Sequence, residues 1–144
     1  MKVNVKKINE NAILPTYGTP YAAGADLYCP TGESVTIAPH ATALIKTGLA
    51  VEIPEGFVGL IYARSGIATK RGLAPANKVG VVDSDYRGEV MVALHNHSDI
   101  EQIVEGGERV AQLVIAPYVS ADFCEVETLS ETVRAEGGFG STGK

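Results

Sequence analysis

The distribution of apolar and polar residues predicts a protein built almost entirely of short β-strands. Residues Val3–Lys6 alternate between apolar and polar positions, as a strand with one buried face does. Other segments of strand length are predicted at Ser34–Ile37, Ala43–Ile53, Val58–Ala63, Gly80–Val82, Glu89–Leu94, Glu108–Ala116 and Phe123–Val126. Clusters of Gly, Pro, Asn and Asp separate them. We therefore expect an all-β fold: a jelly-roll-like β-barrel of short, mostly antiparallel strands.

One short helix is predicted at Ser65–Arg71, with Ser65 as its cap and Gly72 at its end. The chain closes with a glycine-rich stretch, and we predict that residues 131–144 form a mobile arm. A frayed terminus is the simpler alternative. Phe139 stands alone among glycines, however, which favours an arm that folds over a ligand.

Composition narrows the class of protein. The 144 residues are expected to form a single domain, residues 1–144. Twelve Lys and Arg against 17 Asp and Glu give a net charge of −5, which argues against nucleic-acid binding. No apolar run is long enough for a membrane helix, and no secretion signal is evident. Two cysteines favour a reducing compartment, the cytoplasm, or the nucleus in a eukaryote, although a disulfide between Cys29 and Cys124 stays open.

Two motifs carry candidate chemistry. Ala63-Arg64-Ser65-Gly66 places a guanidinium and a hydroxyl at the start of the predicted helix, a position suited to anions; a simple capping serine is the alternative. Asn77–Gly88 is predicted to form a β-hairpin with Asp83 at the end of its first strand, where the carboxylate could activate a water. Gly80 would allow a ligand close to the backbone and Tyr86 would pack on a sugar or base. As the alternative, Asp83 only forms the turn.

Several other polar residues are ambiguous. Asp26 could reach a metal through water or hold a loop, and Gln112 is an amide within an apolar strand, where it must be paired or functional. His95 and His97 share one face of a predicted strand. With no third ligand in the usual spacing, they are interpreted as structural or exposed, and no zinc site is expected.

The order and spacing of five motifs resemble the trimeric dUTPases over nearly the whole chain. The motifs are Ala23–Tyr28, Ala63–Gly66, Asn77–Gly88, Gly107–Leu113 and Arg134–Gly143. The resemblance implies hydrolysis of dUTP to dUMP and pyrophosphate, which keeps uracil out of DNA and supplies dUMP for thymidylate synthesis. Ala63 departs from the family, which more often has proline there.

The resemblance also implies residue roles. Asp83 would activate the water that attacks the α-phosphorus, and Asp26 would hold Mg²⁺ through water while the triphosphate chelates the metal. Asn77 and Gly80 would read uracil, and Tyr86 would contact the deoxyribose. The remaining substrate-binding residues would be Arg64, Ser65, Gly66, Gln112, Arg134, Phe139, Gly140, Ser141 and Thr142, with Phe139 stacked over uracil. The expected partners are dUTP and two further copies of the chain in a homotrimer, without nucleic acid or membrane.

Two alternatives remain at this point. A dCTP deaminase resembles the dUTPases in fold and in the Arg-Ser-Gly segment, but that chemistry usually relies on a glutamate base. A non-catalytic dUTP-binding regulatory protein would be expected to have lost a reacting group, whereas Asp83, Arg64, Gln112 and Phe139 are all present.

Overall fold

The computed structural model describes residues 1–138, in which antiparallel strands form three sheets. The elements are β1 (Asn4–Lys7), β2 (Thr16–Tyr17), β3 (Ala25–Tyr28), β4 (Ser34–Ile37), β5 (Thr42–Glu52), β6 (Phe57–Tyr62), α1 (Ser65–Arg71), β7 (Leu73–Pro75), β8 (Val79–Val82), β9 (Glu89–Asn96), β10 (Gln102–Glu105) and β11 (Arg109–Pro117). The sheet orders are β1-β5-β9-β7, β10-β4 and β2-β3-β11-β6-β8.

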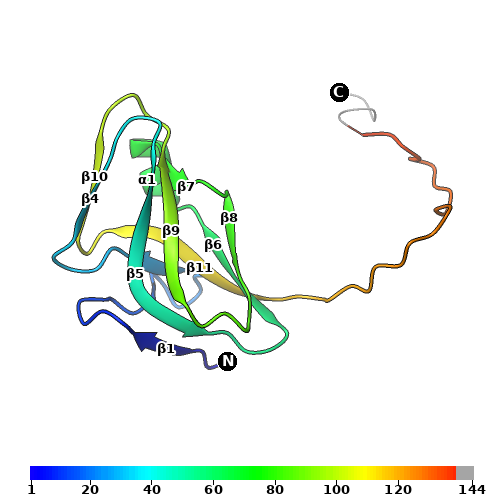
Figure 1. The fold of residues 1–144 in the computed structure, drawn as a ribbon, viewed down its shortest axis with the longest axis horizontal. Coiled ribbons are helices and arrows are strands. Elements are labelled where there is room, and N and C mark those ends of the chain that lie inside the picture. Colours follow the sequence, from blue (N-terminus) through cyan, green and yellow to red (C-terminus); the bar gives the residue numbers. More distant parts are fainter. Residues whose placement is uncertain (139–144) are drawn as a thin grey trace.

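One hydrophobic core joins the three sheets. Along β9 the side chains alternate, with Val90, Val92 and Leu94 buried and the residues between them more exposed. These meet buried residues of the other sheets, among them Leu27 of β3 and Val104 of β10. The arrangement in Figure 1 confirms the predicted all-β, jelly-roll-like class, with the ladders of residues 1–138 divided among three sheets rather than closed into one barrel.

The local predictions were most accurate where a turn or cap defines the element. Ser34–Ile37 and Ser65–Arg71 match β4 and α1 in both bounds. Gly72 ends α1 in the left-handed conformation, with φ of 66°. The predicted cap was wrong, because Arg64 occupies the cap position with extended backbone and no side-chain hydrogen bond closes the helix start.

Two predictions about strands were also wrong. Phe123–Val126 is not a strand: residues 118–138 have no regular structure and lead away from the body of the molecule (Figure 1). A strand needs a neighbouring strand for its backbone hydrogen bonds, and this segment has none among residues 1–138. β8 and β9 are not a paired hairpin, because β8 pairs with β6 while β9 pairs with β5 and β7.

The short helix is fixed to the sheets through its last residue. Arg71 Nε donates to Gln102 Oε1 at 3.0 Å and its NH1 donates to Glu108 Oε2 at 2.7 Å, while NH2 donates to the Ile103 carbonyl. These bonds tie α1 to β10 and to the start of β11. Among residues 1–138, no helix has the length and apolar character needed to cross a membrane.

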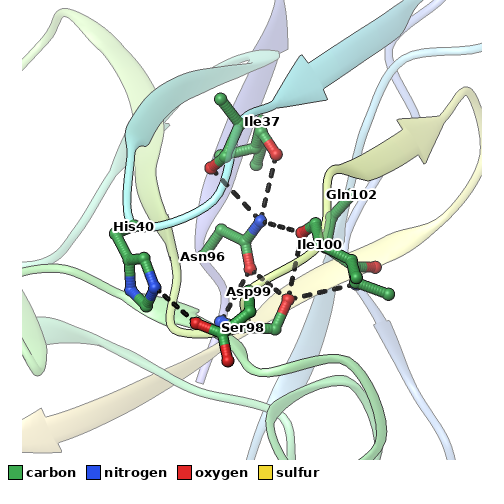
Figure 2. A network of polar contacts seen from close by, with 8 residues as sticks. Ile37, His40, Asn96, Ser98, Asp99, Ile100 and Gln102 are labelled. Atoms are coloured by element: carbon green, nitrogen blue, oxygen red, sulfur yellow. Dashed lines mark hydrogen bonds and ion pairs between the residues drawn. The ribbon is translucent and has the colours of Figure 1, made fainter.

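A buried amide joins the ends of β4, β9 and β10. Asn96 is fully buried, and its Nδ2 donates to the carbonyls of Ile37, Ala38 and Ile100, while its Oδ1 accepts from the backbone N–H and the hydroxyl of Ser98 (Figure 2). The amide thus uses both of its N–H groups and its oxygen, which offsets the cost of burying it. The network fixes the backbone where β9 leaves its sheet.

Candidate active site

Seven of the predicted site residues gather in two clusters, which we call the hairpin pocket and the arginine cluster. The hairpin pocket is lined by Asn77, Gly80, Asp83 and Tyr86, together with residues of β8 and β9. The arginine cluster contains Asp26, Arg64, Arg109 and Gln112.

The hairpin pocket lies between two sheets. Its volume is about 280 Å³, with Gly80–Val82 of β8 on one side and Val90–Ala93 of β9 on the other. Because β8 and β9 are not hydrogen-bonded to each other, side chains and solvent can occupy the space between them. The tertiary arrangement therefore brings together all four residues that the sequence placed in this loop.

Asp83 is the free carboxylate of the pocket. It follows β8 directly and is exposed, and its side chain forms no hydrogen bond or ion pair within the described part of the chain. Glu89 also lines the pocket, but its Oε1 accepts the backbone N–H of Gly48 at 2.9 Å. Asp85 does not line the hairpin pocket; it lines a neighbouring hollow, which Asp83 also borders. Asp83 is consequently the carboxylate of this loop that can hold a water inside the pocket.

The turn after β8 folds the ring of Tyr86 back over the chain. The Tyr86 N–H donates to the Asp83 carbonyl at 3.2 Å and the Tyr86 hydroxyl donates to the Glu89 carbonyl at 2.9 Å. A side chain at Gly88 would overlap the Tyr86 ring and displace it, so glycine allows the ring to take this position. The turn thus presents one side of the Tyr86 ring to the pocket.

A second tight turn positions Asn77 at the other end of β8. Lys78 has a positive φ of 64°, and its N–H donates to the Pro75 carbonyl at 3.0 Å. A Cβ at Gly80 would lie 3.3 Å from the Asn77 amide nitrogen and 3.2 Å from Cβ of Ile61. The amide of Asn77 therefore lies close over the backbone of β8, where glycine leaves room for it.

The arginine cluster is centred on Asp26. Arg64 Nε donates to Asp26 Oδ1 at 2.6 Å, and Arg109 NH1 lies 3.4 Å from Asp26 Oδ2. The Asp26 side chain is 11% exposed, compared with 22% for Arg64 and 52% for Arg109. Two guanidinium groups beside one carboxylate leave a local excess of positive charge, suited to an anion.

Gln112 fixes the backbone next to Arg64. Its Nε2 donates to the Ala63 carbonyl at 2.8 Å, and it lies opposite Asp26 in the β3–β11 ladder and opposite Tyr62 in the β6–β11 ladder. A Cβ on Gly24 would come within 2.5 Å of the Gln112 side-chain oxygen. The sequence required this amide to be either paired or functional, and in the structure it is paired. Ser65 and Gly66 follow Arg64, exposed in the first turn of α1.

The two clusters lie at opposite ends of one ladder. In the β6–β8 pairing, Val82 lies opposite Gly59, and Val79 lies opposite Tyr62. Asp83 thus continues beyond one end of the ladder and Arg64 beyond the other. By this register Asp83 is level with Val58, six residues before Arg64, and six steps of about 3.3 Å along a strand place the two backbones roughly 20 Å apart. Within one chain, Asp83 and Arg64 therefore cannot contact the same phosphate group.

The arm contributes nothing to either cluster within the described residues. Arg134 Nε donates to the Gly137 carbonyl at 2.9 Å, a bond inside the arm itself. The other predicted arm residues, Phe139, Gly140, Ser141 and Thr142, lie outside the described part of the chain.

Sequence reasoning missed Arg109, Gly24 and Gly88 as individual site residues. Arg109 and Gln112 are three apart, so a regular strand would send their side chains to opposite faces. A register shift between Arg109 and Ala111 brings Arg109 to Asp26. For Gly24 and Gly88, the sequence indicated a role in the site only through their positions within the motifs.

Known proteins of one family are similar to this chain over nearly its whole length. A family model described as dUTPase matches residues 10–143. Deoxyuridine 5'-triphosphate nucleotidohydrolases of Nautilia profundicola and Hydrogenobaculum sp. are 51% and 49% identical to the chain, over 100% and 99% of both partners.

Solved structures show the same similarity in three dimensions. The dUTPase of Staphylococcus bacteriophage 80alpha with dUpNHpp superimposes with a TM-score of 0.90 at 32% identity, covering 99% of each chain. A variant dUTPase from phage phi11 of S. aureus, whose description concerns a structural Mg(II) ion, gives a TM-score of 0.79 at 29% identity, covering 89% of this chain and 98% of that one.

Proposed function

Because the chain belongs to the dUTPase family and hydrolyses dUTP to dUMP, we propose that its hairpin pocket and arginine cluster are two halves of one active site shared between neighbouring subunits. The observation that carries this proposal is the separation of Asp83 and Arg64 at opposite ends of the β6–β8 ladder. A triphosphate bound by the arginine cluster of one subunit would meet the hairpin pocket of the next.

In the proposed mechanism the hairpin pocket holds the nucleoside. The Asn77 amide, with one donor pair and one acceptor, pairs with the uracil edge beside the backbone at Gly80, and Tyr86 lies against the deoxyribose. The Asp83 carboxylate takes a proton from a water that attacks the α-phosphorus, and the bond to the bridging oxygen breaks. The products are dUMP and pyrophosphate. Positioning and charge neutralisation supply most of such a reaction's acceleration.

The arginine cluster of the neighbouring subunit receives the phosphates. Arg64 and Ser65 contact their oxygens, with Gly66 leaving the first turn of α1 open, while Gln112 holds the Ala63–Arg64 backbone in place. We propose that the arm, residues 131–144, closes from a third subunit, with Phe139 over uracil and with Arg134, Gly140, Ser141 and Thr142 at the phosphates.

The residues present fit a magnesium ion that is chelated mainly by the triphosphate. Residues 1–138 contain no group of three or more His, Cys, Asp or Glu side chains able to cage a metal ion. Asp26 has carboxylate lone pairs beyond those directed at Arg64 and Arg109, so it can hold a metal-bound water. When bound, the ion would neutralise phosphate charge.

A homotrimer is supported by the apolar residues that one chain leaves in water. Val119, Phe123 and Leu129 of the extended segment are 92%, 93% and 87% exposed. Such surface is normally covered by a partner. Both cysteines are free thiols, which supports a reducing compartment, and we place the enzyme in the cytoplasm.

Mixing two inactive variants tests the shared site. Asp83→Asn should abolish most turnover while retaining dUTP binding, because an amide cannot accept the water's proton. Arg64→Gln should be inactive but keep a donor for Asp26. If each site takes Asp83 and Arg64 from different subunits, random co-assembly of the two variants in equal amounts restores about one quarter of wild-type activity. No recovery in verified mixed oligomers would contradict the proposal.

Two controls complete the experiment. Asp85→Asn changes the neighbouring carboxylate, which does not line the hairpin pocket, and should keep near-normal activity. Pyrophosphate release should be compared for dUTP, UTP, dTTP and dCTP with and without Mg²⁺. Ammonia release from dCTP would overturn the assignment of Asp83 as a hydrolytic base.

A further inference from the structure

A pair of histidines on the outer face of the four-stranded sheet has no part in the proposed hydrolysis. His95 lies in β9 and His97 follows two residues later, so both side chains point to the same face. Their ring centroids are 4.4 Å apart, and their planes meet at 69°. The rings therefore approach edge to face and do not stack.

The backbone that carries the two rings is fixed on both sides. His95 lies opposite Thr42 of β5 and opposite Ala74 of β7 in the two ladders. The N–H of His97 donates to the Gly72 carbonyl at 2.8 Å. Asn96, between the histidines, points inward and makes the buried network of Figure 2. The backbone positions of both histidines are thus fixed by the sheet.

A second contact prepares His95 as a ligand. The Thr42 hydroxyl oxygen lies 2.9 Å from His95 Nδ1. When Nδ1–H donates to that oxygen, the lone pair of the neutral ring is on Nε2, and such a bond orients a ligating imidazole. His40 is paired with Asp99 at 2.8 Å.

We propose that His95 and His97 together chelate a divalent transition-metal cation, with Cu²⁺ bound most tightly and water completing the coordination. Metal–nitrogen bonds of about 2.1 Å at an angle near 90° place two imidazole centres roughly 4.5 Å apart, close to the observed spacing. Right-angled nitrogen pairs suit the tetragonal geometry of Cu²⁺, which also leads the affinity order of the divalent ions.

The site is distinct from that of the catalytic magnesium. Imidazole nitrogen suits copper, nickel and zinc, whereas Mg²⁺ prefers oxygen ligands. No third His, Cys, Asp or Glu within residues 1–138 completes a cluster with the pair, so a closed structural zinc site is excluded there. The occupant is therefore an exchangeable ion on the surface of a chain that folds without it.

Electron paramagnetic resonance of the full-length protein with one equivalent of Cu²⁺ tests this proposal. The measurement uses a Cys124→Ser background, because the exposed thiol would bind or reduce copper. Hyperfine structure from two imidazole nitrogens is expected. His95→Asn and His97→Asn should each weaken Cu²⁺ binding at least ~10-fold, and Thr42→Val about 10-fold through the lost orienting bond.

The matched control is His40→Asn, which removes the third nearby histidine and should leave Cu²⁺ affinity within about 2-fold, since its ring is engaged by Asp99. Magnesium-dependent dUTP turnover should be unchanged in all four variants. Signals from a single nitrogen, or unchanged affinity in His95→Asn or His97→Asn, would overturn the chelate. If these variants lost dUTP turnover, the metal site would not be separate from the active site. That result would leave the proposed role of Asp83 unaffected.

Discussion

Arg64 Nε donates to Asp26 Oδ1 across 2.6 Å, and this ion pair joins the start of α1 to strand β3. Asp26 is thereby an anchor for the guanidinium that would meet the phosphates, in addition to its proposed contact with magnesium through water. The relationship also separates the two arginines of the cluster, because Arg109 lies farther from Asp26 and is more exposed. The contributions of the two arginine contacts to the free energy of unfolding should therefore differ measurably.

Asp26→Asn should lower the free energy of unfolding by about 1–3 kcal/mol, because Arg64 loses a charge-assisted hydrogen bond in a mostly buried position. Arg109→Gln should cost less than about 1 kcal/mol, since its 3.4 Å contact is largely solvent-exposed. Urea unfolding of both variants measures the difference, and dUTP saturation curves should show a raised KM for Asp26→Asn. Equal losses of stability would show that the short pair is not the anchor.

Gly24→Ala should impair the site through Gln112. The new Cβ would lie 2.5 Å from the Gln112 side-chain oxygen and 3.1 Å from its Cβ, so the amide must move and lose its 2.8 Å bond to Ala63. We expect a loss of about 1–2 kcal/mol in stability and of roughly 10-fold in turnover, measured by urea unfolding and pyrophosphate release. Gly18→Ala is the control, because its Cβ would meet nothing within 4 Å. Normal activity in Gly24→Ala would remove Gln112 from this role.

Deleting residues 131–144 should leave a folded protein with strongly reduced turnover. Residues 131–136 and 138 are exposed and lie beyond the last strand, so little core is lost. Turnover should fall roughly 100-fold or more if the arm excludes water and closes on the phosphates. Thermal unfolding and pyrophosphate release distinguish the outcomes. A collapse of the melting temperature would instead identify the segment as a structural strap between subunits.

Cys29 should be unreactive in the native protein, whereas Cys124 is exposed. Burial, followed by the nearby charges of Glu33, Glu108 and Glu105, raises the pKa of Cys29 from 9.0 to about 11. A disulfide reagent should therefore modify at most one thiol per native chain and both thiols in denaturant. Rapid modification of Cys29 under native conditions would contradict its burial.

The same raised pKa predicts an alkaline loss of stability. Above pH 9 the unfolded chain releases the Cys29 proton while the folded chain retains it until about pH 11, so stability falls across this window. Cys29→Ala should be less stable at neutral pH because it leaves a small cavity, but its stability should decline less steeply between pH 9 and 11. Parallel slopes for both proteins would remove Cys29 as the cause.

Local structure, and the chemistry available to it, could be predicted from the order of the residues alone. Alternation of side chains, turn residues and the left-handed glycine at Gly72 act within a few positions of the chain, so β4 and α1 could be predicted to the residue. The hairpin-pocket residues were also predictable as a group, because Asn77, Gly80, Asp83 and Tyr86 lie within one loop and the strand it flanks.

Which of these elements lie side by side depends on the folded chain as a whole. The pairing of β8 with β6, the absence of a partner for Phe123–Val126 among residues 1–138, and the arrival of Arg109 at Asp26 depend on strands distant in sequence and on one register shift. The same register separates Asp83 from Arg64. Backbone hydrogen bonds must be satisfied across the whole sheet at once, and a local pattern of side chains does not contain that requirement.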